Sequence, residues 1–177
     1  ALVAVAVCDA VQAVCGQRPQ IKWTNDIILH GKKLCGVLTE MSVEGETGAL
    51  QSVVAGMGVN VSQTAQDFAQ AGLGEIATSL TLEGCPVDRN ELAAALLRAL
   101  DRMARAFPAA HADYLARYRA DCVTLGRDVT LLRPSGPVEG RAVAVGDDFS
   151  LEVAYPDGST EAVSSGEVSV RGIGGYL

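Results

Sequence analysis

The chain has 177 residues, of which 49% are hydrophobic, 20% charged and 5% aromatic. This length suits one or two domains, and the aliphatic content excludes collagen-like and intrinsically disordered chains. The 14 Lys and Arg residues against 21 Asp and Glu residues give a net charge of −7. This balance disfavours a general binder of nucleic acid or of anionic membranes, because both need a basic surface.

The cysteines are odd in number and scattered along the chain: Cys8, Cys15, Cys35, Cys85 and Cys122. They form no CxxC pair, and only two histidines accompany them, so the sequence disfavours a zinc site. Scattered thiols of this kind are typical of proteins in a reducing cytosol. We therefore expect free thiols and a cytoplasmic location.

The first predicted element is a helix over residues 1–16 that closes near Gly16. Apolar residues occupy most of its faces, which predicts packing on both sides. Asp9 and Gln12 interrupt the apolar run, which is too short to span a bilayer and lacks the basic region of a signal peptide. The chain begins without Met, like a core helix entered midway, so we do not take 177 residues as the length of the natural protein.

Short strands follow, and we expect an antiparallel meander because their connections are too short for crossover helices. Gly31-Lys32 suits a tight hairpin turn, and Glu44–Gly48 suits a second turn. The strands are predicted at Ile21–Trp23, Ile27–His30, Lys33–Met41 and Leu50–Met57. Residues 62–87 carry few strong signals and are expected to be irregular.

Two helices come next along the chain. Asp88 and Glu91 suit a capping box, which starts a helix with apolar residues at helical spacing up to Phe107. Pro108 separates this helix from a second one that contains Tyr114, Leu115 and Tyr118.

Beyond residue 127 the pattern changes to short alternating runs separated by turns rich in Gly, Pro and Asp. The runs are Val129–Leu132, Val138–Val145, Leu151–Tyr155 and Ala162–Val170. Short strands with tight turns predict a small barrel. We therefore place a domain boundary near residue 122.

The densest group of polar residues surrounds the first hairpin. Lys22-Trp23-Thr24-Asn25-Asp26 precedes the hairpin, and Lys32 and Lys33 lie at its tip. Asn-Asp is a common turn pair and hairpin lysines are commonly solvated, so spacing alone favours a structural interpretation. Trp23, in a strand, is expected in the core rather than against a ligand.

A second group is Gly56-x-Gly58-x-Asn60. It is not the dinucleotide-binding fingerprint, because Val61 stands where the third glycine is needed, and it is not a P-loop. Paired glycines at a strand end commonly allow close backbone packing or a bulge. The functional alternative is that they let a flat ligand approach the backbone, with the Asn60 amide bonding to it.

Four stretches occur in the order and at the separations found in biotin protein ligases: KWTNDIILHGKKLCGVLTE at 22–40, VVAGMGVNV at 53–61, IATSL at 76–80 and GEVSVRG at 166–172. The chain resembles this family from Ala1 to about Gly172. The resemblance implies an α/β (α+β) fold. Residues 1–121 would be the later part of a catalytic domain, N-terminally incomplete, with a mixed sheet like that of class II aminoacyl-tRNA synthetases. Residues 122–177 would form a small SH3-like β-barrel.

The resemblance implies a ligase that works in two steps. Biotin and ATP, with Mg²⁺, form biotinyl-5′-AMP and pyrophosphate, and the biotinyl group then moves to a lysine of a biotin carboxyl carrier protein. Lys33 matches the family's catalytic lysine, whose ammonium offsets the repulsion between carboxylate and phosphate. Asp26 is expected near the phosphates, either as a ligand of Mg²⁺ or as a base for the incoming lysine.

By the same resemblance, Asn25 and Asn60 would hold the adenosine of ATP, since an amide both donates and accepts hydrogen bonds. Gly36 and Leu38 lie, with Lys33, where the family lines its biotin site. In a regular strand Lys33 and Gly36 face opposite sides, so either a backbone contact or a bulge is required.

Two further expectations rest on the resemblance. Glu167 and Arg171 match a barrel segment that reaches the nucleotide in some relatives, although a surface salt bridge is the ordinary alternative. Family members also form homodimers through the catalytic sheet, which makes a second copy a possible partner.

The sequence departs from the family pattern in three ways. Thr24 replaces the usual proline of KWPND, and the family's Gly/Arg-rich loop of the GRGRxGR type is not found. The Ser/Thr pair and the Gln that hold the biotin ring are also not found, and Arg18 is the one basic residue in positions 1–20. We therefore expect the 177-residue chain alone to have little ligase activity.

Two alternatives to a biotin ligase stay open. Lipoate ligases share an ND…GKK-like element, although Trp23, the Gly56-x-Gly-x-Asn60 ending and GEVSVRG favour biotin. A non-catalytic binding module, with the barrel docking a partner protein, is supported by the loop that is not found.

Overall fold

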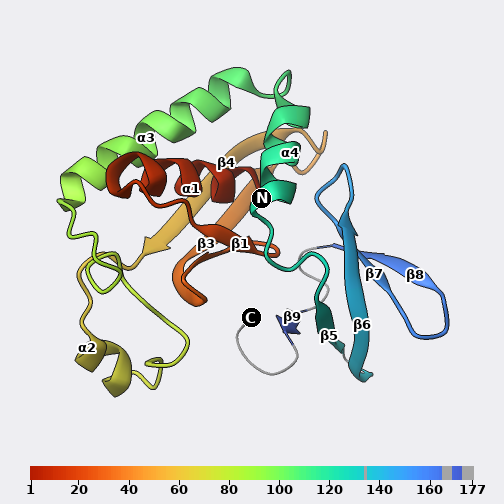
Figure 1. Ribbon diagram of the computed structural model, residues 1–177. Coiled ribbons are helices and arrows are strands. Elements are labelled where there is room, and N and C mark those ends of the chain that lie inside the picture. Colours follow the sequence, from red (N-terminus) through yellow and green to blue (C-terminus); the bar gives the residue numbers. More distant parts are fainter. Residues whose placement is uncertain (134, 165–168, 173–177) are drawn as a thin grey trace.

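The first half of the chain is built on an antiparallel sheet whose four strands lie in chain order (Figure 1). The computed structural model describes residues 1–133, 135–164 and 169–172, the last four by their backbone alone. The strands are β1 (Gln20–Lys22), β2 (Asp26–Leu29), β3 (Lys32–Val43) and β4 (Leu50–Val59). The predicted meander is therefore confirmed, and β4 lies at one edge of the sheet.

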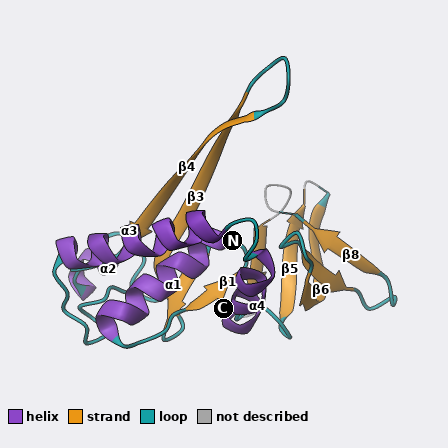
Figure 2. Ribbon diagram, turned by 90° about the horizontal axis from the view of Figure 1, so that it is seen from above, coloured by secondary structure: helices purple, strands orange, loops and turns teal. Residues whose placement is uncertain are grey.

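The strands β3 and β4 continue past the helices as a long hairpin, which projects from the rest of the molecule in Figure 2. Its turn comes at residues 44–49, as the polar stretch there predicts. Large apolar side chains are exposed along both strands: Leu38, Met41, Val43, Leu50, Val53 and Val54.

The opening helix α1 (Leu2–Cys15) is confirmed and ends at Gly16, whose φ of 70° suits a residue without Cβ. It contacts strands β1 and β2 as well as helices α3 (Arg89–Ala106) and α4 (His111–Asp121). Its buried residues, Val3 to Cys8 together with Ala10 and Val11, cover several faces of the helix, as the apolar pattern predicts. Helix α1 therefore packs on both sides, between the sheet and α3 (Figure 1).

The segment that was expected to be irregular contains a short helix, α2 (Ala65–Gln70). Thr64 and Asp67 form a capping box: the Thr64 hydroxyl accepts from the Asp67 amide at 3.2 Å, and the Asp67 carboxylate accepts from the Thr64 amide at 2.7 Å. Asp instead of Glu at the third helical position made this signal weak in the sequence. At α3, Asp88 caps the helix as predicted, accepting from the amides of Asn90 and Glu91.

The second sheet is also antiparallel, with strand order β8-β7-β6-β5-β9. Its strands are β5 (Asp128–Arg133), β6 (Gly136–Val145), β7 (Leu151–Ala154), β8 (Thr160–Val163) and β9 (Ser169–Gly172). The predicted run over 162–170 is thus divided between β8 and β9, and β9 crosses back to pair with β5. The chain is a mixed α+β protein with two antiparallel sheets.

The two sheets share one hydrophobic core. A single cluster of buried side chains includes Ile21 and Trp23 from the first half, and Leu131 and Leu151 from the second. The Val123 amide donates to the Ile21 carbonyl at 2.9 Å, so the segment after α4 runs alongside β1.

The prediction of free thiols is wrong for two of the five cysteines. Cys15, at the end of α1, forms a disulfide with Cys85, which lies 70 residues further along the chain. Packing of α1 brings the end of the helix to the loop before α3, a proximity that spacing could not reveal. Cys8, Cys35 and Cys122 are free and buried. No helix in the described part of the chain is both long enough and apolar enough to cross a membrane.

Candidate active site

The centre of the candidate site is an ion pair between neighbouring strands. The Lys33 ammonium on β3 lies 2.6 Å from Oδ1 of Asp26 on β2, and both side chains are half-buried at 37% and 23% exposure. A two-residue turn, His30-Gly31, joins the strands with φ values of 47° and 83°. The predicted hairpin is confirmed, with its turn one residue earlier than expected.

A β-bulge places Lys33 on the same face as Gly36. Ile27 pairs with Cys35 and Ile28 pairs with Lys33, so Leu34 is the extra residue on β3. A Cβ on Gly36 would lie 3.4 Å from Lys33 Cε and 3.5 Å from Nζ. The alternative left open by the sequence is thereby decided: a bulge brings the ammonium over Gly36.

The backbone of Lys33 is fixed by the IATSL stretch. The Lys33 amide donates to the Ile76 carbonyl at 2.8 Å, and the Thr78 amide donates to the Lys33 carbonyl at 2.9 Å. The same stretch continues to Asn60, whose carbonyl accepts from the Leu80 amide at 3.0 Å. Two motifs that are far apart in sequence therefore meet at the lysine.

The two adjacent lysines have different surroundings. Lys32 donates to the carbonyl of Gly74 at 2.9 Å and so connects the hairpin to the loop that follows α2. Lys33 instead faces the carboxylate of Asp26 over the open side of the sheet. This difference supports Lys33, rather than Lys32, as the functional lysine.

Next to the ion pair, three glycines form a flat floor. Gly36 lies opposite Asp26 on β2 and opposite Gly58 on β4, and residues directly opposite in an antiparallel sheet share a face. One row further, Leu38 lies opposite Gly56. A Cβ on Gly58 or Gly56 would come no nearer than 3.8 Å to another atom, so packing within the chain does not require these glycines. The expectation that these two glycines allow close backbone packing is therefore not met, and a surface open to a ligand stays a prediction.

The two faces of this sheet differ in burial. Cys35 and Val37 point to the helix side and are buried, whereas Leu38 on the floor side is 64% exposed. The floor thus has an apolar end at Leu38 and a cationic end at Lys33. Such a surface suits a flat, apolar ligand that carries a negative charge at one end.

The two predicted asparagines lie next to strand ends, with Asn25 directly before β2 and Asn60 directly after β4. The Asn25 side-chain amide donates to the Val37 carbonyl at 2.5 Å, and the Val37 amide donates to the Asn25 carbonyl at 3.0 Å. Asn25 therefore fastens its own turn to β3, a role that the sequence did not indicate. Asn60 is half-buried. Its backbone amide donates to the Leu34 carbonyl at 2.9 Å, directly at the bulge.

Two predicted residues belong to the C-terminal segment. Glu167 lies outside the described residues, and Arg171 is described by its backbone in β9, where it pairs with Thr130 of β5. Their expected contact with a nucleotide stays a prediction.

Two observations bear on other chemistry at the site. Burial raises the pKa of the Cys35 thiol to about 12, so this neighbour of Lys33 stays protonated and is not a nucleophile. Among the residues that the structure describes, no three or more His, Cys, Asp or Glu side chains gather as a metal site.

Comparisons with known proteins agree with these observations. Residues 124–171 match the family described as "Biotin protein ligase C terminal domain". The bifunctional ligase/repressor BirA of Bacillus spizizenii is 30% identical over 173 residues, covering 93% of this chain and 50% of BirA. The biotin–[acetyl-CoA-carboxylase] ligase of Mycobacterium tuberculosis is 34% identical over 171 residues, covering 93% of this chain and 59% of that ligase. The chain thus spans only about half the length of these curated relatives.

Solved structures show the same fold. The apo structure of biotin protein ligase from Aquifex aeolicus superposes with a TM-score of 0.81 at 22% identity, covering 97% of this chain and 73% of that one. The same ligase in complex with biotin and ATP gives a TM-score of 0.78 at 23% identity, covering 97% and 69% of the two chains.

Proposed function

We propose that this chain, which belongs to the biotin protein ligase family, contributes the lysine and the biotin floor of an active site for ATP-dependent biotin ligation. The observation that carries the proposal is the Lys33–Asp26 pair standing beside the floor of Gly36, Gly58 and Gly56. Biotin has an apolar hydrocarbon chain and sulfur-containing ring, a polar ureido group and a terminal carboxylate. The apolar and cationic ends of the floor complement the hydrocarbon chain and the carboxylate.

In the first step, a carboxylate oxygen of biotin would attack the α-phosphorus of ATP, and pyrophosphate would leave. Both reactants are anionic, and the Lys33 ammonium would offset their repulsion and hold them together. In the second step, an amine of the carrier protein would attack the acyl carbon, and AMP would leave. The relative from Aquifex aeolicus whose structure holds biotin and ATP supports this choice of substrates.

Further roles follow from position. Lys33, Gly36 and Leu38 would line the biotin site, and Asn25 and Asn60 the adenosine site. Because one amide hydrogen of Asn25 is already bonded to Val37, Asn25 would bind adenosine mainly through its remaining donor and its side-chain oxygen. Glu167 and Arg171 would reach the nucleotide from the C-terminal segment.

Mg²⁺ is commonly bound by one or two carboxylates together with substrate phosphates. Asp26 fits this pattern because its carboxylate is half-buried beside the ammonium that would meet the phosphates. We assign Asp26 to Mg²⁺ once ATP is bound, where the ion would neutralise phosphate charge. The alternative role is as a base for the incoming lysine.

At the level of the fold, we assign residues 1–121 to the later part of a catalytic domain like that of class II aminoacyl-tRNA synthetases, and residues 122–177 to an SH3-like barrel. The two antiparallel sheets, with the second beginning at Asp128, support this division.

Two macromolecular partners are proposed. One is a biotin carboxyl carrier protein, whose lysine would approach the open face of the floor. The other is a second copy of the chain, joined through the sheet. The exposed edge of β4 supports the second proposal, since no strand in the described ranges pairs with the outer side of Leu50–Val59.

We also propose that the 177-residue chain alone is a weak enzyme, since its sequence contains no Gly/Arg-rich loop for the phosphates. The test is therefore a binding titration of the ¹⁵N-labelled chain, in which the backbone amide resonances report where each ligand binds. Biotin should shift the resonances of Gly36, Leu38 and Gly58, and ATP with Mg²⁺ should shift those of Asn25 and Asn60. If lipoate rather than biotin shifts the resonances of the floor, the lipoate ligase alternative is favoured. If none of these ligands shifts them, the proposal is wrong and a non-catalytic module is favoured.

A further inference from the structure

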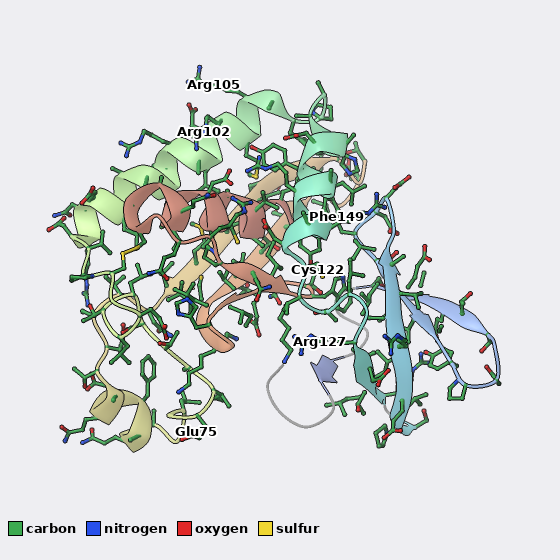
Figure 3. The ribbon with its side chains drawn as sticks, in the orientation of Figure 1. Glu75, Arg102, Arg105, Cys122, Arg127 and Phe149 are labelled. Carbon is green, nitrogen blue, oxygen red and sulfur yellow. A yellow bond between two sulfur atoms is a disulfide. The ribbon has the colours of Figure 1, made fainter. Side chains whose placement is uncertain are left out.

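The turn between β6 and β7 docks on the segment that carries Asn25 and Asp26, although it lies more than 120 residues away in the chain. Figure 3 labels Phe149 at this junction, where the end of the β6–β7 hairpin meets α4. The Phe149 carbonyl accepts a hydrogen bond from the Trp23 indole nitrogen at 2.9 Å. Its ring packs edge-on against Tyr118 at 5.4 Å and against His111 at 5.5 Å.

Tyr118 connects this junction directly to the candidate site. Its side chain is fully buried, and its hydroxyl donates to the Thr24 carbonyl at 2.8 Å. Thr24 immediately precedes Asn25 and Asp26, so the bond fixes the backbone at the start of their turn. Burial raises the pKa of the Tyr118 phenol well above its usual range, so the hydroxyl stays a donor at working pH.

The Phe149 turn is itself held firmly. Nε and Nη2 of Arg119 on α4 donate to the Val145 carbonyl at 2.8 and 2.5 Å, and Nη2 also reaches Asp147 at 3.0 Å. Within the turn, the Gly146 amide donates to the Ser150 carbonyl at 2.8 Å. Phe149 has a φ of 65°, a left-handed conformation that these contacts maintain.

A third bond acts on the same strand end. The Trp23 amide donates to the hydroxyl of Thr124 at 2.9 Å, in the segment that follows α4. Three polar groups of Trp23 and Thr24 are therefore bound by residues that lie 94 or more positions later in the chain. They are the Trp23 indole, the Trp23 amide and the Thr24 carbonyl. Nothing in the local sequence of the turn supplies these partners.

We propose that Tyr118 is a positioning residue for Asp26, and that Phe149 holds Tyr118 in place, so that the second sheet sets the geometry of the Lys33–Asp26 pair. The catalytic meaning of that geometry rests on the proposed ligase function, whereas the positioning itself does not. An error of about 1 Å in the placement of a reacting group can cost about a hundredfold in rate, so a fixed turn matters for function.

The Val37 amide is a direct reporter of this positioning, because it donates to the Asn25 carbonyl when the turn is docked on β3. Tyr118→Phe keeps the buried ring and its contact with Phe149 but removes the bond to Thr24. Tyr114→Phe is the matched control: it removes a hydroxyl from a buried tyrosine on the same helix, whose ring lies 5.0 Å from the Arg117 guanidinium. Both variants keep the aromatic core and are expected to fold.

The experiment is residue-resolved hydrogen exchange on the unliganded chain. In Tyr118→Phe the Val37 amide should exchange at least fivefold faster, with no matching change in the buried amides of α1. Phe149→Leu should produce a smaller increase at Val37, and Tyr114→Phe should produce none. An unchanged Val37 amide, or an equal increase throughout the protein, overturns the proposal, because a purely structural role lowers all protection together.

A parallel titration separates this proposal from the proposed function. If the parent chain binds biotin or ATP, Tyr118→Phe should weaken that binding at least threefold while Tyr114→Phe leaves it unchanged. Unchanged affinity in Tyr118→Phe contradicts the link to the site. If the parent chain binds neither ligand, the ligase proposal fails, and the exchange result still decides whether Tyr118 positions the turn.

Discussion

Gly36 on β3 and Gly58 on β4 lie directly opposite each other, on the face of the sheet where Lys33 meets Asp26. Neither is held by a left-handed φ, and a Cβ on Gly58 would find only ordinary contact with the Gly36 carbonyl at 3.8 Å. The fold therefore has room for a side chain at Gly58. We expect such a side chain to affect a molecule that lies on the floor.

We expect Gly58→Val to fold normally and to lose ligand binding. A strand glycine costs about 0.5–1 kcal/mol relative to alanine, so a β-branched replacement should leave stability unchanged or higher. The branched side chain would occupy the floor and lower biotin affinity by tenfold or more. Calorimetry and thermal unfolding measure the two effects separately.

The matched control for this change is Gly45→Val, in the turn of the projecting hairpin. A Cβ at Gly45 would meet no atom within 4 Å, and the position lies at the other end of the hairpin from the floor. Gly45→Val should leave biotin affinity unaffected. Equal affinity in the Gly58 and Gly45 variants would show that the floor is not the binding surface.

The neighbouring lysines should respond in opposite ways to replacement by alanine. Lys33→Ala removes one half of a partly exposed ion pair, which contributes only about 0–1 kcal/mol to stability, so the fold should hold. Ligand binding should fall by tenfold or more, because a charge-assisted hydrogen bond to an anion is worth about 1.5–3 kcal/mol.

Lys32→Ala removes the bond to the Gly74 carbonyl and should cost about 0.5–1.5 kcal/mol of unfolding free energy without changing ligand affinity. Denaturant unfolding and biotin or ATP titration of both variants test this crossed pattern. A Lys33→Ala chain that binds as well as the parent would remove the main support for the proposed site.

The sequence predicted the local elements of this structure, but not the contacts between elements that are distant in the chain. The helix ending at Gly16, the hairpin before Lys33 and the Asp88 cap all depend on neighbours within a few positions, so their patterns predicted them. The bulge at Leu34 depends on how β3 pairs with β2. Strand periodicity alone could only show that Lys33 and Gly36 would face opposite sides of a regular strand.

The candidate site shows the same division. Family resemblance selected Lys33 and Asp26, and the structure brings them together at 2.6 Å. The supports of the site were missed, because they come from distant segments: Ile76 holds the backbone of Lys33, and Tyr118 holds that of Thr24. Neither residue type carries a signal for such a role, since both are also ordinary core residues.

The Cys15–Cys85 disulfide should contribute measurably to stability. A cross-link between residues 70 positions apart restricts the unfolded chain, and bonds of this kind typically add about 2–4 kcal/mol. Reduction should therefore lower the midpoint of denaturant unfolding. The double variant Cys15→Ser, Cys85→Ser should match the reduced parent and be insensitive to reductant. Reductant that leaves the parent's midpoint unchanged would contradict a stabilising bond.

Acid should loosen the segment that holds Lys33. Glu83 accepts hydrogen bonds from the Thr78 hydroxyl and from His30, each at 2.5 Å, and so supports the stretch that pairs with the lysine backbone. Burial acts to raise the pKa of the Glu83 carboxyl, but the hydrogen bonds from Thr78 and His30 outweigh it, and the pKa lies below its ordinary value. A lowered folded-state pKa means that the stabilising contribution is fully present above the unfolded value, about 4.3, and is lost as pH falls through the folded value.

The comparison that isolates this carboxylate is the parent chain against Glu83→Gln, which keeps a side-chain acceptor but does not titrate. At pH 7 the variant should have a lower free energy of unfolding, and its amides at Lys33 and Thr78 should exchange faster. As pH falls through the lowered folded-state pKa, the Glu83 carboxyl becomes protonated, so the two stability curves should converge. Curves that stay parallel down to the lowest measurable pH would show that Glu83 contributes no charge-dependent support, and that Thr78 and Lys33 are held by backbone hydrogen bonds alone.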